Sequence, residues 1–192
     1  MLKATLLLLA GGESKRMGQP KPLLPVGAVT LVEWLAARLG DSFAEVLVSA
    51  NDPQLVPKGL RMVRDRRAGH LGPLAGIEAG LHAATNEVMV AVACDMPRVT
   101  ADLAERLIQL SEGHDAAVPR IGGRPEPAFA SYRQTAAWAI VEALDMGRLK
   151  AAGGTTKMDV VWCDDAALRM FCELKTPHDS QAVLAALSHA TP

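Results

Sequence analysis

The chain has 192 residues, enough for one domain with a substantial core; 49% of them are hydrophobic and 21% are charged. The formal net charge of -1 excludes a global basic field for nucleic acid and a polybasic membrane signature, so any anion site must be local. Cys94, Cys163 and Cys172 are widely spaced and form no metal-binding or disulfide pattern, which indicates a reducing, cytoplasmic setting.

Apolar runs alternate along the chain with segments whose apolar residues recur at helical spacing. The run ATLLLLA at 4–10 is typical of a strand buried on both faces, and it is too short for a signal peptide or a membrane span. Pro73 opens one helical segment, Thr100 is a predicted N-cap, and Gly40 and Gly147 end two others. The patterns predict strands at 4–10, 45–50, 60–65, 87–94, 115–120, 127–132 and 158–164, and helices at 30–40, 73–84, 100–110, 135–147 and 177–190.

This alternation of strands and helices predicts a single α/β domain over 1–192 with a mostly parallel sheet. Such sheets bind ligands beyond the carboxyl ends of their strands. The loops to inspect are therefore those that follow residues 10, 50, 65 and 94.

The first of these loops combines glycines with cations. Gly11 and Gly12 allow backbone N–H groups to approach a ligand closely, and Arg16 and Lys21 carry charges suited to phosphate oxygens. The pattern is neither a Walker A loop nor GxGxxG. Because the loop follows a buried strand directly, it predicts a phosphate site; the alternative is an ordinary glycine turn with solvated cations.

The second and third loops carry polar residues that suit a nucleoside. Asn51 offers a donor and an acceptor for a base or ribose edge, although asparagine after a strand is also an ordinary turn residue. Asp65 ends a predicted strand, and Gly69, Gly72 and Gly76 occupy the loop and first turn that follow. This segment is interpreted either as a cover over a ligand next to a helix N-terminus or as a plain connection.

The fourth loop places Asp95 directly after a fully apolar strand. A carboxylate at this edge is the expected position of a Mg²⁺ ligand, because Mg²⁺ takes one or two carboxylates together with substrate phosphates and waters. The alternative is a cap for the next helix, a role for which Thr100 is better placed. Cys94 is interpreted as a small buried hydrophobe, and the five histidines show no metal-binding spacing.

Taken together, these motifs resemble the molybdenum cofactor guanylyltransferases, a family of Rossmann-like nucleotidyltransferases. The stretch LAGGESKRMGQPKPLL marks the nucleotidyltransferase group, and GPLAGIEAGL followed by CDMP narrows it to the molybdopterin branch. The resemblance covers nearly the whole chain. It implies a three-layer fold with helices on both faces of the sheet, and Mg²⁺-dependent transfer of GMP from GTP to molybdopterin with release of pyrophosphate.

The resemblance also implies a division of labour along the chain. Residues 1–110 would bind the nucleotide and 111–192 the acceptor. Arg16, Lys21 and Asp95 would be catalytic, with the metal on Asp95. Partners would be molybdoenzymes or other proteins of cofactor biosynthesis, without nucleic acid or membrane. The nucleotide contacts would fall on Leu9, Ala10, Gly11, Gly12, Lys21, Asn51, Asp65 and Asp95.

The chain departs from the family pattern at three places. Pro20 stands where the family usually has Asp before the lysine, Glu126 replaces the histidine of a His-Pro pair, and FCELKTPHD at 171–179 has Glu173 and Lys175 in place of two asparagines. The last two lie in the acceptor half. They leave as alternatives a molybdenum cofactor cytidylyltransferase, which GQPKPLLP also resembles, transfer to another phosphorylated acceptor, and a nucleotide-binding regulatory module without catalysis.

Overall fold

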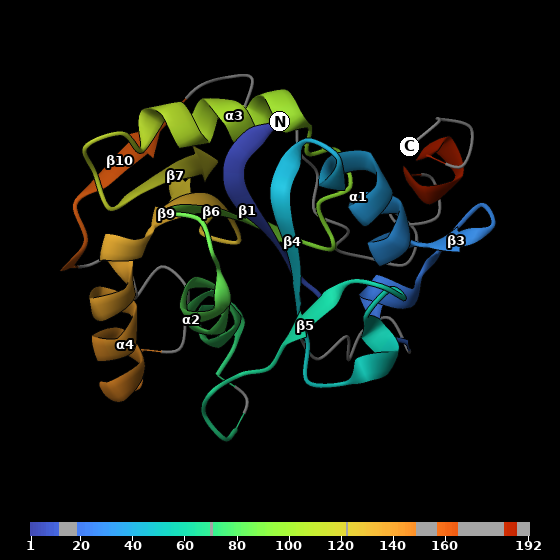
Figure 1. The fold of residues 1–192 in the computed structure, drawn as a ribbon, viewed down its shortest axis with the longest axis horizontal. Helices are drawn as coiled ribbons and strands as arrows, with labels where there is room; N and C mark the ends of the chain where they lie inside the picture. The colour runs from blue at the N-terminus through green and yellow to red at the C-terminus, as the bar shows by residue number, and fades with distance from the viewer. Residues whose placement is uncertain (12–18, 70, 122, 149–156, 165–182, 188–192) are drawn as a thin grey trace.

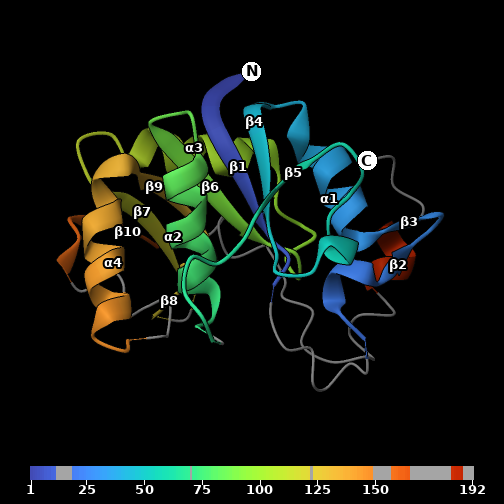
Figure 2. The same ribbon diagram turned by 60° about the horizontal axis from the view of Figure 1, so that its bottom comes forward.

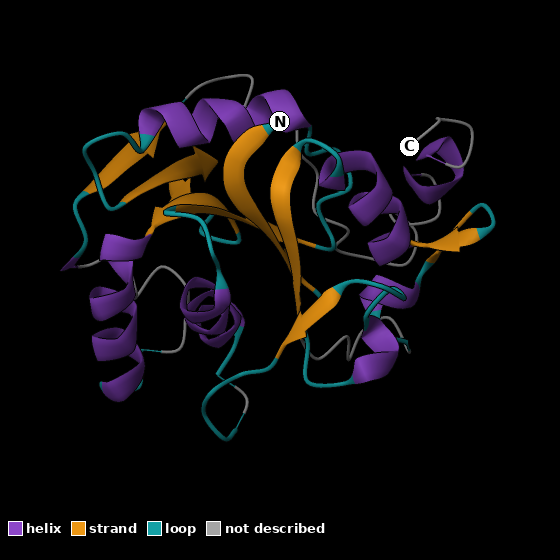
Figure 3. Ribbon diagram, in the orientation of Figure 1, coloured by secondary structure: helices purple, strands orange, loops and turns teal. Residues whose placement is uncertain are grey.

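The computed structural model describes residues 1–11, 19–69, 71–121, 123–148, 157–164 and 183–187. Figures 1 and 3 show a sheet flanked by helices. The sheet contains β1 (Leu2–Leu9), β4 (Phe43–Ser49), β5 (Arg61–Val63), β6 (Val88–Ala93), β7 (Ala116–Ile121), β8 (Arg124–Pro125), β9 (Phe129–Arg133) and β10 (Val160–Cys163). The helices are α1 (Leu31–Gly40), α2 (Pro73–Ala83), α3 (Ala101–Leu110) and α4 (Ala137–Asp145), with 3₁₀ turns η1 (Lys21–Leu23), η2 (Pro53–Leu55) and η3 (Gln134–Ala136) and a small hairpin of β2 (Pro25–Val26) and β3 (Val29–Thr30).

The predicted α/β fold is confirmed, with two strands, β8 and β9, that run against the others. The strand order is β10-β7-β9-β6-β1-β4-β5, and β8 pairs with β7. β1 is parallel to β4 and β6, and β7 is parallel to β10, whereas β9 is antiparallel to both β6 and β7. Two antiparallel steps cancel, so β7 and β10 point the same way as β6. The carboxyl ends of all the long parallel strands therefore face one edge of the sheet.

The sheet is the middle of three layers. Along β1, Leu6 and Leu8 belong to a core cluster with α1 and α3, whereas Leu7 and Leu9 belong to a cluster with α2 and α4. Successive side chains of a strand point to opposite faces, so an unbroken apolar run buries both. Figure 1 shows α1 and α3 on one side of the sheet and α2 and α4 on the other.

The helix ends agree with the predicted capping with one exception. Thr100 accepts a hydrogen bond from the Leu103 N–H at 3.3 Å, and Gly147, at φ 68°, follows the end of α4. Gly40 is instead the last helical residue, because right-handed Asp41 takes the C-cap position. Of the helix predicted at 177–190, residues 183–187 are helical and the others lie outside the described residues. Within the described parts, no helix has the length and apolar content needed to cross a bilayer.

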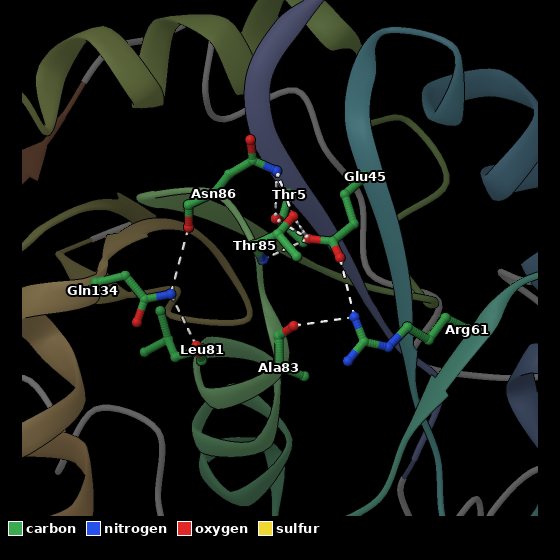
Figure 4. Close-up of polar contacts among 8 residues, drawn as sticks. All are labelled: Thr5, Glu45, Arg61, Leu81, Ala83, Thr85, Asn86 and Gln134. Atoms are coloured by element: carbon green, nitrogen blue, oxygen red, sulfur yellow. Dashed lines mark hydrogen bonds and ion pairs between the residues drawn. The ribbon is translucent and has the colours of Figure 1, made fainter.

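A polar network closes the amino edge of the sheet (Figure 4). Glu45 accepts hydrogen bonds from the Thr5 hydroxyl at 2.7 Å, from the Thr85 N–H and hydroxyl at 2.9 and 3.0 Å, and from Arg61 at 3.3 Å. The Asn86 amide adds a bond to the Thr5 hydroxyl at 3.1 Å. Burial raises the pKa of Glu45, but these hydrogen bonds and the Arg61 charge outweigh it and leave the pKa below 4.5. The network ties β1, β4 and β5 to the turn before β6.

Candidate functional site

A cavity of about 510 Å³ lies at the carboxyl edge of the sheet, the edge toward which β1 runs from the N-terminus in Figure 2. The four loops that follow residues 10, 50, 65 and 94 all contribute residues to it. Among the predicted nucleotide contacts, those that line the cavity are Leu9, Gly11, Lys21, Asn51, Asp65 and Asp95. Ala10 is buried at the end of β1, and Gly12 and Arg16 lie outside the described residues.

Backbone hydrogen bonds just beyond the strands hold these loops in line. The Ala10 N–H donates to the Ser49 carbonyl at 2.9 Å, and the Cys94 N–H donates to the Leu9 carbonyl at 3.2 Å. The ladder of the parallel sheet thus continues past the strand ends. The side chains that follow β1, β4 and β6 are thus brought to one cavity from separate parts of the chain.

Lys21 and Asp95 form an ion pair within this cavity. The Lys21 Nζ donates to the Asp95 Oδ2 at 2.6 Å, and the two side chains are 26% and 22% exposed. Lys21 begins the 3₁₀ turn η1, with Pro20 as its N-cap at φ -60° and Pro22 buried behind it. Both prolines suit this backbone, because their ring fixes φ near -65°. Proline at 20 therefore holds the lysine in a defined turn.

Asp95 lies in the turn that ends β6, where the Met96 N–H donates to the Ala93 carbonyl at 3.0 Å. Within the described ranges, no group of three His, Cys, Asp or Glu side chains gathers to hold a metal ion. A Mg²⁺ ion at Asp95 would therefore need phosphate oxygens and waters as its other ligands, which is how Mg²⁺ is usually held. The donor set fits an ion that arrives with a nucleotide better than a free one.

Asn51 and Asp65 bind each other across the cavity wall. The Asn51 amide donates to the Asp65 Oδ2 at 2.8 Å, and the Asp65 N–H donates to the Asn51 Oδ1 at 3.1 Å. The strand predicted at 60–65 is shorter, since β5 ends at Val63, so Asp65 belongs to the loop. The reciprocal pair leaves carboxylate lone pairs for the donor groups of a base or a ribose.

Sequence reasoning did not assign a role to several lining residues. Leu71 and Ala128 contribute apolar wall, and Glu126 contributes a carboxylate where the β7–β8 hairpin meets the cavity. Leu71 and Ala128 were signalled only by their place after a strand or turn, and Glu126 also by its departure from the family pattern. Cys94 also lines the cavity, but burial and then the neighbouring Asp95 charge raise the pKa of its thiol. It stays protonated, in agreement with its interpretation as a buried hydrophobe.

A second cavity of about 480 Å³ lies beside α2 and α4 and is lined by Glu78, His82 and Gln134 among others. None of the residues predicted for a site lines it. The cavity at the carboxyl edge is thus the candidate functional site.

The fold and this site together define a class of protein. The class is that of nucleotide-binding α/β domains. Three features define it: glycine after the first strand of a mostly parallel sheet, a lysine paired with a strand-end aspartate, and an amide–carboxylate pair at the same edge. Comparison with known proteins specifies the family.

Residues 6–154 match the family described as the MobA-like NTP transferase domain, and the chain belongs to this family. A probable molybdenum cofactor guanylyltransferase of Pelotomaculum thermopropionicum is 39% identical over 91% of this chain and 85% of its own length. The molybdenum cofactor guanylyltransferase of Cereibacter sphaeroides is 40% identical over 77% and 75% of the two chains. The crystal structure of molybdopterin-guanine dinucleotide biosynthesis protein A from Archaeoglobus fulgidus superposes with a TM-score of 0.82 at 26% identity and covers 96% of this chain and 98% of its own. The predicted resemblance and the enzyme class, a nucleotidyltransferase, are confirmed.

Proposed function

We propose that this enzyme transfers GMP from GTP to a molybdopterin-type acceptor and releases pyrophosphate. The observation that carries the proposal is the Lys21–Asp95 pair, in which a lysine ammonium and a strand-end carboxylate lie 2.6 Å apart in the cavity at the sheet edge. The names of relatives that match most of the chain, molybdenum cofactor guanylyltransferases, support the choice of substrates. The reaction is proposed for the cytoplasm, where buried free thiols such as Cys94 and Cys163 persist.

In this mechanism an acceptor phosphate attacks the α-phosphorus of the nucleotide in line, the new P–O bond forms, and the bond to pyrophosphate breaks. Lys21 and Arg16 neutralise charge on the α-phosphate and on the leaving pyrophosphate, while the backbone of Gly11 and Gly12 cradles the phosphates. Mg²⁺ held by Asp95 would supply further charge neutralisation at the phosphate oxygens. No general base is needed, because a phosphate monoester is already ionised near neutral pH.

The nucleoside is assigned to the other end of the cavity. Leu9, the last residue of β1, lines the cavity there, and the Asn51–Asp65 pair offers acceptors to the base or ribose. The acceptor is assigned to the side formed by residues 111–192, where Glu126 lines the cavity. Among the described residues of this half, Glu126 and Ala128 line the cavity, and Glu126 brings the charge that an acceptor would meet there.

Replacement of Asp95 by Asn tests the proposal. Asp95→Asn removes the metal-binding charge while it keeps the shape of the side chain, so pyrophosphate release from GTP with molybdopterin and Mg²⁺ should fall by about 100-fold or more. Asp41→Asn, at the exposed C-cap of α1, is the matched control and should retain wild-type activity. Full activity of Asp95→Asn would refute the role of Asp95.

A nucleotide panel tests the base. GTP, CTP, ATP and UTP, each with Mg²⁺ and at equal concentration, are compared by thermal shift, because a ligand that binds the folded state more tightly raises Tm further. The proposal expects GTP to give the largest shift. A larger shift with CTP would assign the enzyme to cytidylyl transfer.

A further inference from the structure

Arg67 joins the loop between β5 and α2 to two helices at once. Its Nε donates to both carboxylate oxygens of Glu78 at 3.3 Å, and its Nη2 donates to the Glu78 Oε1 at 3.3 Å. Its Nη1 donates to Asp145, the last residue of α4. A planar guanidinium with several donors can make these contacts together, which a lysine ammonium cannot do in the same geometry.

Glu78 makes this contact unusual. It lies within α2, is only 6% exposed, and is the one buried carboxylate among the described residues. A buried carboxylate must be paired, because removal from water otherwise costs more than the fold gains. Arg67 supplies that pairing from the loop, so the loop backbone at 67 is fastened to the surface of α2.

The residues just beyond Arg67 reach the candidate site. Gly69, Leu71 and Gly72 line the cavity, but Arg67 is not among its lining residues. Gly69 and Gly72 have φ values of 102° and 67°, a backbone that residues with a Cβ rarely adopt. The segment is thus held at Asp65 by Asn51 and at Arg67 by Glu78 and Asp145, and it turns into the cavity through glycines.

We propose that Arg67 is a positioning residue for the nucleotide: by bridging Glu78 and Asp145 from outside the cavity, it holds Gly69, Leu71 and Gly72 against the bound nucleoside triphosphate. The inference rests on the proposed function, since it assigns the cavity to a nucleotide. Arg67 touches neither substrate nor the reacting atoms. Its loss removes binding that is equal in the ground and transition states, which raises KM for GTP and leaves kcat unchanged.

Three variants separate positioning from charge balance. Arg67→Gln leaves Glu78 buried without its partner, so it should lower Tm and raise KM and Kd for GTP by roughly 10- to 100-fold, the scale of a misplaced binding element. The double variant Arg67→Gln with Glu78→Gln removes both charges and should recover Tm but keep the weak nucleotide binding. Arg66→Gln removes the same charge from the neighbouring exposed position and should match the wild type.

Hydrogen exchange gives a readout that needs no substrate. In the ligand-free protein, the amides of 66–69, Leu71 and Gly72 should exchange faster in Arg67→Gln and in the double variant than in the wild type and Arg66→Gln. The proposal is overturned if Arg67→Gln shows the exchange rates and the KM of the wild type. It is also overturned if the double variant recovers wild-type exchange rates and KM together with wild-type Tm. If the wild type binds none of the nucleotides, the proposed function fails, and the exchange comparison still decides whether Arg67 holds the segment.

Discussion

Removal of the Lys21 charge should have opposite effects on two ligands of the same cavity. Lys21 is paired with Asp95 at 2.6 Å. A triphosphate gains a cation from Lys21, whereas a metal ion at Asp95 competes with that cation. Lys21→Met should therefore weaken the binding of GTP and strengthen the binding of Mg²⁺ alone.

The magnitudes follow from the exposure of the pair. With side chains 26% and 22% exposed, the ion pair contributes at most about 1 kcal/mol to folding, as partly exposed pairs do. In a chain of 192 residues this lowers Tm by about 4 °C or less. A hydrogen bond from Lys21 to a phosphate is worth about 1.5–3 kcal/mol, which corresponds to a loss of about 10- to 150-fold in GTP affinity.

Titration calorimetry with GTP and Mg²⁺, and thermal shift with Mg²⁺ alone, measure the two effects. Lys157→Met, which removes the partner of Glu142 on α4, is the matched control and should change neither ligand. The reasoning is refuted if Lys21→Met binds GTP as the wild type does. It is refuted equally if Mg²⁺ alone stabilises the variant less than the wild type.

Two further substitutions test the fold around the site. Glu45→Gln should lose about 1–3 kcal/mol of unfolding free energy at pH 7. The folded-state pKa of Glu45 lies below its ordinary value of 4.5. The stability difference between wild type and variant should therefore be present above pH 4.5 and disappear as acid protonates the wild-type carboxylate. An equal difference in urea melts at pH 7 and pH 3 would contradict the assignment. Gly80→Ala puts a Cβ 2.5 Å from the Leu7 Cδ2 and should cost about 1–3 kcal/mol. Gly40→Ala is the control, because its Cβ would lie 3.5 Å from the Val46 Cγ2 and should leave the unfolding free energy unchanged. Equal urea midpoints for the two glycine variants would exclude tight packing of α2.

The layered fold was predictable because each element carries its own local signal. An apolar run such as 4–10 indicates burial on both faces, and the Thr100 cap indicates where a helix begins. The direction of β9 carries no such signal, because antiparallel and parallel neighbours of a buried strand have the same periodicity. The two-residue strands of the β2–β3 hairpin are shorter than any pattern can identify.

The candidate site was predictable as a place but not as a set of contacts. Asn51, Asp65 and Asp95 each follow a strand, and a parallel sheet brings such positions to one edge. The pairing partners depend on how side chains meet in space. Asn51 and Asp65 are 14 residues apart in the sequence, and Lys21 and Asp95 are 74 residues apart. Glu78 in the helix at 73–84 was not predictable as a buried charge, since its partner comes from the preceding loop.

Pro20 shows how a departure from the family pattern can be consistent with the site. Its φ of -60° is the value that proline prefers, so this residue caps the turn of Lys21 without strain. A proline brings no carboxylate next to the lysine. The carboxylate seen on Lys21 comes instead from Asp95, on a different loop, and is itself the proposed metal ligand. Phosphate that engages Lys21 thus frees Asp95 for a cation, so nucleotide and metal should bind with positive coupling.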